Sequence, residues 1–153
     1  MSGLSAFLAN NAAKIENEKY VVSSRFFETV KETNAFGKEV EVKKAIPWEI
    51  RALSEAENES LRKQCTTMIP VNKGTAKQEK TDYNKYLGKL VVAATVFPDL
   101  HSAELQSSYN VLGADNLIKI MLTPGEYSDY LAKVQEVNGF DKDMDELVEE
   151  AKN

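Results

Sequence analysis

The sequence predicts an α+β fold, with a small N-terminal β-hairpin or meander followed by a mainly α-helical C-terminal two-thirds. Between residues 20 and 52, apolar and polar side chains alternate, which is the pattern of strands with one buried face. From residue 54 onward, apolar side chains recur every three or four residues, and helix-capping sequences separate the repeats. We expect one domain over residues 1–153, made of an amphipathic N-terminal arm (1–17), a β element (18–53) and a helical part (54–153).

The first fifteen residues predict an amphipathic helix of about three turns, with Ser2 or Ser5 as its N-cap. Four large apolar side chains fall on one face of this helix: Leu4, Phe7, Leu8 and Ile15. A helix this short is marginally stable in isolation, so it needs a surface to lie on. That surface is either the protein's own core or a binding partner.

Residues 20–52 predict a β-hairpin or small meander, in which the sequence Asn34-Ala35-Phe36-Gly37 supplies the turn. Pro47 cannot donate a hydrogen bond to a sheet, so it places its strand at an edge or interrupts it. Trp48 is interpreted as a core residue. Five apolar residues of the second half share one parity and are expected to face the core: Val40, Val42, Ile46, Trp48 and Ile50.

Capping signals predict the helices of the C-terminal part. Ser54 and Glu57 form a capping box that opens a helix over about 55–66, and the polar residues 69–80 are expected to form an exposed loop. Thr81 or Asp82 caps the next helix, which we expect to end at Pro98. Further helices are expected at 102–110, at 114–122, from the capping box Thr123-Pro124-Gly125-Glu126 to Asn138-Gly139, and from Asp143 onward.

Composition excludes several classes of protein. The single cysteine rules out an internal disulfide, and the single histidine rules out any site with two imidazoles. The longest apolar run, Leu90–Phe97, is far shorter than the about 20 residues that span a bilayer. The N-terminus lacks the basic and apolar regions of a secretory signal. We therefore expect a cytoplasmic protein with no membrane partner.

The sequence contains few groups suited to catalysis. Cys65 and His101 are the one available nucleophile–base pair, and a small hydrolase would require them to meet. Cys65 is better explained as a buried thiol, and His101 as a surface or capping residue. We therefore predict a binding protein that is not an enzyme and uses no cofactor.

The acidic C-terminal segment superficially matches the opening of a calcium loop. Asp141, Asp143 and Asp145 give the pattern D-x-D-x-D, but Glu146 and Lys152 occupy the positions that require glycine and a bidentate glutamate. We predict no metal site, and we explain the carboxylates as favourable charge at a helix N-terminus.

The charge is unevenly distributed around a net value of −5. Residues 61–90 carry seven basic and two acidic side chains, whereas residues 91–153 carry four basic and twelve acidic ones. The basic segment is interpreted as a solvated loop and helix edge. The alternative is a small nucleic-acid-binding regulator that uses residues 61–90, with the helices at 102–122 mimicking a helix-turn-helix. The acidity of the chain argues against nucleic acid as a partner.

Several blocks of sequence carry a resemblance to a known family: MSGLSAFLANN, YVVSSRF, PWEIRALSEAENESLRKQC, VFPDL-x-x-AELQ-x-SY and MLTPGEY-x-DYLAKVQE-x-NGF. Through them the chain resembles the XkdN-like tail assembly chaperones, which occur in contractile-tailed phages and defective prophages of Gram-positive bacteria. The resemblance covers nearly the whole chain and is densest over 81–153. Residues 28–46 are longer than the compact hairpin associated with this family.

The resemblance implies a non-enzymatic role in tail morphogenesis. Such a chaperone is expected to bind the tape-measure protein, with tail-tube subunits as a second candidate partner, until the tube polymerises. It is expected in the cytoplasm of the bacterial host and not in the mature particle. Because a tape measure is a long helical protein with apolar stripes, an amphipathic arm suits it. We therefore assign partner binding to the apolar face of the arm: Leu4, Phe7, Leu8 and Ile15. The oligomeric state is left open.

Overall fold

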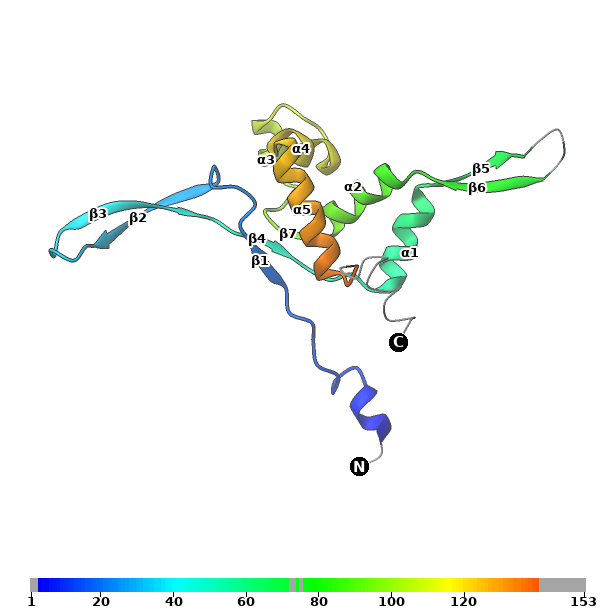
Figure 1. Cartoon of the computed structure of the whole chain (residues 1–153), viewed down its shortest axis with the longest axis horizontal. Helices are drawn as coiled ribbons and strands as arrows, with labels where there is room; N and C mark the ends of the chain where they lie inside the picture. The colour runs from blue at the N-terminus through cyan, green and yellow to red at the C-terminus, as the bar shows by residue number, and fades with distance from the viewer. Residues whose placement is uncertain (1–2, 72–73, 75, 141–153) are drawn as a thin grey trace, which may run out of the picture.

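The computed structural model describes residues 3–71, 74 and 76–140, and it confirms the α+β class. A body of helices and short strands carries two projecting hairpins and an N-terminal arm (Figure 1). In chain order the elements are the 3₁₀ helix η1 (Gly3–Phe7), β1 (Glu18–Tyr20), β2 (Phe27–Thr33), β3 (Glu39–Ala45), β4 (Trp48–Ile50), α1 (Glu55–Gln64), β5 (Thr66–Pro70), β6 (Lys77–Thr81), α2 (Tyr83–Ala94), β7 (Thr95–Phe97), α3 (Ala103–Ser108), α4 (Ala114–Met121) and α5 (Pro124–Val137).

A three-stranded antiparallel sheet with the order β1-β4-β7 lies at the centre of the body. Because β4 is the middle strand, Pro47 does not mark an edge; it interrupts the chain between β3 and β4. The predicted extension of the second helix to Pro98 is wrong. That helix ends at Ala94, since the β-branched and aromatic residues that follow it form strand β7.

The core lies between this sheet and helices α2, α4 and α5. Trp48 is 2% exposed, which confirms its predicted burial, and its ring meets that of Tyr130 edge-on at a centroid distance of 5.0 Å. The Tyr130 hydroxyl lies 2.6 Å from Thr95 Oγ1, and burial raises the pKa of Tyr130 to about 12. Besides these two aromatic residues, the largest fully buried side chains are Ile50, Leu90, Val91, Leu100, Leu117, Ile118 and Val134.

The β2–β3 hairpin projects from the body (Figure 1). The predicted turn is confirmed: the Asn34 carboxamide oxygen accepts hydrogen bonds from the amides of Phe36 and Lys38, and Gly37 adopts a φ of 76°. Of the five residues expected to face the core, Trp48 and Ile50 are buried, but Val42 and Ile46 are only half-buried and Val40 is 38% exposed. The expectation is wrong for these three because only β4, after Pro47, enters the body.

The predicted loop at 69–80 is also wrong, because β5 and β6 pair in register from Thr66↔Thr81 to Pro70↔Lys77. The two strands form the β5–β6 hairpin, and the hydroxyls of Thr66 and Thr81 lie 2.8 Å apart at its base. Most of its side chains are exposed. A hairpin with two solvated faces shows no alternation of apolar and polar residues, so its sequence is typical of a loop.

The predicted helix signals agree with the structure where it describes them. Ser54 with Glu57 and Thr123 with Glu126 form capping boxes, and Asp82 caps α2. Helix α5 stops at Asn138, and Gly139 follows at a φ of 84°. The helix expected from Asp143 lies outside the described residues. Among the helices of the described ranges, none has the length and apolar character needed to cross a membrane.

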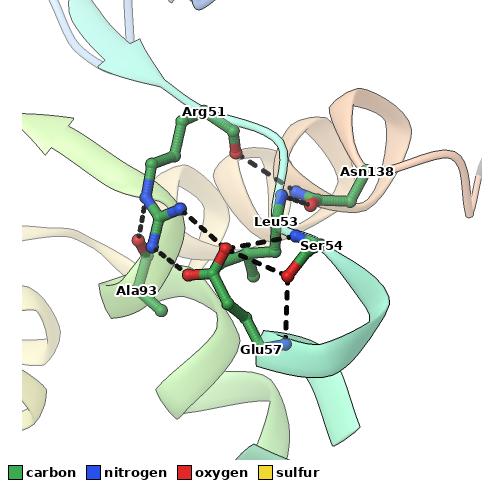
Figure 2. Close-up of polar contacts among 6 residues, drawn as sticks. All are labelled: Arg51, Leu53, Ser54, Glu57, Ala93 and Asn138. Atoms are coloured by element: carbon green, nitrogen blue, oxygen red, sulfur yellow. Dashed lines mark hydrogen bonds and ion pairs between the residues drawn. The ribbon is translucent and has the colours of Figure 1, made fainter. Parts of the chain in front are cut away.

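A polar network ties the chain after β4 to three helices (Figure 2). The Arg51 guanidinium donates to the Ala93 carbonyl of α2 at 3.0 Å and forms two hydrogen bonds with the Glu57 carboxylate of α1. The side chain of Asn138, at the end of α5, accepts from the Leu53 amide at 2.7 Å and donates to the Arg51 carbonyl at 3.5 Å. The network therefore joins segments that are 87 positions apart in the sequence.

We expect Asn138→Ala to lower the free energy of unfolding by about 1–3 kcal/mol, because the Leu53 amide loses its acceptor in a part-buried site. Urea denaturation followed by circular dichroism measures this change. Asn84→Ala, at an exposed position of α2, is the matched control and should change stability by less than about 0.5 kcal/mol. Equal effects of the two substitutions would contradict the role given to Asn138.

Candidate interaction surface

The N-terminal arm extends away from the body (Figure 1). Its helix is shorter than predicted: η1 covers Gly3–Phe7, and the Asn11 carboxamide bonds back to the Ser5 carbonyl at 2.9 Å, which closes the turn. The alternative in which the arm packs on its own core is wrong, because all four predicted partner-binding side chains are exposed. The exposed fractions are 70% for Leu4, 81% for Phe7, 48% for Leu8 and 77% for Ile15.

A second apolar feature, which we call the apolar groove, lies at the foot of the β2–β3 hairpin and has a volume of about 370 Å³. Its floor includes the buried Trp48 and Met121, and its rim includes Phe27 and Phe97, which are 43% and 51% exposed. Ten residues from strands and helices line the groove: Arg25, Phe26, Phe27, Ile46, Trp48, Phe97, Pro98, Leu105, Tyr109 and Met121.

One side of the groove is fixed by an ion pair between Arg25 and Glu126. Arg25 also donates to the Met121 carbonyl at 2.9 Å. The Arg25 hydrogen bond, together with donors from Ser23 and Thr123, lowers the pKa of the Glu126 carboxyl to about 2. Glu126 therefore caps α5 and also joins the chain before β2 to the helices. The charge of Arg25 at the groove is already paired.

Glu57 and Glu126, which complete the capping boxes of α1 and α5, lead us to expect that the folded protein loses stability in acid. A hydrogen bond from Arg51 lowers the pKa of Glu57 to about 2, as Arg25 does for Glu126. Because both pKa values are lower in the folded chain, their stabilisation is complete above the ordinary value of 4.5 and is lost as the pH falls toward 2. Urea denaturation at a series of pH values measures this loss.

The double variant Glu57→Gln, Glu126→Gln should be less stable than the natural protein at pH 7, and its stability should change less between pH 5 and pH 3. Glu104→Gln, on the exposed surface of α3, is the control and should keep the natural profile. A double variant with the unaltered pH profile would contradict this account.

The structure does not bring the candidate nucleophile and base together. Cys65 is buried at 3% exposure beside the base of the β5–β6 hairpin, as predicted for a structural thiol. His101 is exposed and lines a different hollow, next to Ala114. Within residues 3–71, 74 and 76–140, no cluster of His, Cys, Asp and Glu is arranged to hold a metal ion. The carboxylates weighed as a calcium loop lie outside these ranges.

The basic segment 61–90 is divided among α1, the β5–β6 hairpin and α2. On α1, Arg62 and Lys63 pair with acidic side chains of the same helix. The second helix of the proposed helix-turn-helix mimic, α4, buries Leu117 and Ile118 in the core, and Lys119 is its one basic residue. The arrangement gives little support to the nucleic-acid alternative.

Sequence reasoning missed the apolar groove and the Arg25–Glu126 pair. The two residues of the pair are 101 positions apart, and no local pattern links them. The aromatic pair Phe26-Phe27 and the sequence Phe97-Pro98 are visible in the sequence, but only the fold places them side by side. A body with an exposed apolar arm and an apolar groove is typical of a protein that acts by binding other proteins.

Comparison with known proteins supports this class and identifies the family. The chain belongs to the phage XkdN-like tail assembly chaperone family, whose model matches residues 4–152. The chain is 29% identical over 151 residues to the phage-like element PBSX protein XkdN of Bacillus subtilis strain 168. It is 30% identical over the same length to YqbN of that strain. Each alignment covers 98% of this chain and 93% of the relative.

The fold is also similar to a solved structure. The crystal structure of the protein YqbN superposes with a TM-score of 0.68 and 23% sequence identity. The superposition covers 91% of this chain and 98% of that one. The α+β architecture is therefore shared with an experimentally determined structure.

Proposed function

We propose that this tail assembly chaperone binds the tape-measure protein during tail morphogenesis, through the apolar face of its N-terminal arm, and performs no catalysis. Tail-tube subunits are a second candidate partner. In this proposal the protein acts in the cytoplasm of the bacterial host and leaves before the particle is complete. Neither nucleic acid nor membrane is part of the proposed binding.

The exposed arm is the observation that carries the proposal. Leu4, Phe7 and Ile15 each leave at least 70% of the side chain exposed. Isolated apolar residues on a protein surface are ordinary, but a terminal segment that concentrates them is typical of a binding element. A long helical client with an apolar stripe would bury these side chains, because amphipathic helices bind their partners through apolar residues three or four positions apart.

Co-expression with the tape-measure protein of the same phage or prophage tests the proposed function. We expect the tape measure to be insoluble alone and soluble with the chaperone, and size-exclusion chromatography with light scattering should show a complex of fixed stoichiometry. Co-expression with the tail-tube subunit is the parallel arm of the experiment. A tape measure equally soluble without the chaperone, and no complex, would contradict the proposal.

A further inference from the structure

We propose that the apolar groove binds the N-terminal arm of a second copy of this chain, so that two copies exchange arms in a symmetric dimer. This contact between copies forms without a client, and a client that binds the same arm would displace the arm from the groove. It would cover both apolar features of the molecule, which are otherwise exposed to solvent. Each copy has one arm and one groove, so a reciprocal exchange between two copies fills both grooves and closes as a two-fold dimer.

The chemistry of the arm matches that of the groove. Residues 3–13 carry no charged side chain and present Leu4, Phe7 and Leu8. The groove is lined mainly by apolar residues, and its charged lining residue, Arg25, is already paired with Glu126. An arm seated there would bury apolar surface and leave no unpaired charge away from water. The groove volume of about 370 Å³ lies within the range of about 300–1,000 Å³ typical of ligand pockets.

The sheet register explains why the arm would come from another copy. The chain enters β1 at Glu18, opposite Ile50, whereas the groove lies at the other end of β4, beside Trp48. The groove also lies toward the β7 edge of the sheet, and β1 forms the opposite edge. The arm runs away from the body (Figure 1). To reach its own groove it would have to reverse direction and cross the sheet, whereas a second copy can meet it directly.

Light scattering and sedimentation of the full chain, without a client, measure the predicted dimer. We expect a mass of about twice the 17.1 kDa of one chain. The arm variant Leu4→Ser, Phe7→Ser and the groove variant Phe27→Ser, Phe97→Ser should each raise the dimer dissociation constant by at least ~30-fold, since each removes two large apolar contacts. Their equimolar mixture should recover part of the association, because the mixed pair keeps one intact arm and one intact groove.

The control variant is Phe36→Ser, Leu112→Ser, which removes two apolar side chains exposed at 88% and 86%. It should dimerise like the natural protein. A monomer at every concentration, or a dimer that both arm and groove variants leave unchanged, would overturn the inference. Circular dichroism verifies that each variant is folded.

Disulfide trapping distinguishes a partner's groove from the chain's own. In a Cys65→Ser background, the pair Phe7→Cys and Phe97→Cys should form a covalent dimer under mild oxidation. Phe7→Cys with Leu112→Cys is the control and should remain uncrosslinked. A disulfide within one chain, or none, would overturn the inference. The groove variant keeps a free arm and should still bind the tape measure, so failure of the dimer and failure of the proposed function give different results.

Discussion

Trp48→Ala is expected to lower the free energy of unfolding by about 3–5 kcal/mol, because it truncates the largest of the fully buried side chains. Trp48 is 2% exposed and contacts the rings of Tyr130 and Phe26. Its removal would leave a cavity between the sheet and α5 and would also take away part of the groove floor. For a domain whose total stability is about 5–15 kcal/mol, this change is a large fraction.

Urea denaturation followed by far-ultraviolet circular dichroism measures this effect without relying on the lost indole fluorescence. Trp48→Phe should cost less, because an aromatic ring still fills most of the site. Phe36→Ala is the matched control at an aromatic side chain that is 88% exposed, and it should change stability by less than about 0.5 kcal/mol. A loss below about 1 kcal/mol for Trp48→Ala would contradict its position at the centre of the core.

The triple arm variant Leu4→Ser, Phe7→Ser, Leu8→Ser is expected to weaken tape-measure binding by about 100-fold or more. All three side chains are at least 48% exposed, so folding of the body should not depend on them. The expected signature is therefore a large loss of affinity with an unchanged free energy of unfolding of the monomer. Calorimetric titration of the soluble chaperone with a tape-measure fragment measures the affinity.

Phe36→Ser, Leu112→Ser is again the control, because it removes exposed apolar surface at sites away from the arm. It should bind the client like the natural protein. If the arm variant and the control bound equally well, the assignment of partner binding to the arm would be wrong, even with the chaperone function intact.

The sequence was most informative where local chemistry determines structure. Capping boxes at Ser54 and Thr123 and the turn at Asn34 depend on residues within four positions of one another, and all three are present. The β5–β6 hairpin could not be predicted in this way. Its exposed strands have no buried face to impose an alternating pattern, and their pairing depends on backbone hydrogen bonds that any residue except proline can donate.

Of the two apolar features, the sequence predicted the arm but not the groove. The spacing of Leu4, Phe7 and Leu8 identified the arm, but not whether the arm packs on its own body, because that outcome depends on tertiary contacts. The groove was not predictable from the sequence. Phe27 and Phe97 line the same groove only because β4 pairs with β7 and the β2–β3 hairpin joins the body beside them. A groove assembled from distant segments leaves no periodic signal in the sequence.

Photo-crosslinking from the arm tests the central claim most directly. A photoreactive phenylalanine analogue replaces Phe7, which is 81% exposed, and the chaperone is co-expressed with the tape-measure protein. The same analogue at Phe36, 88% exposed on the hairpin turn, is the control. We predict a covalent adduct of chaperone and tape measure from position 7 and little from position 36. A soluble complex that gives no adduct from position 7, or no complex at all, would contradict the account.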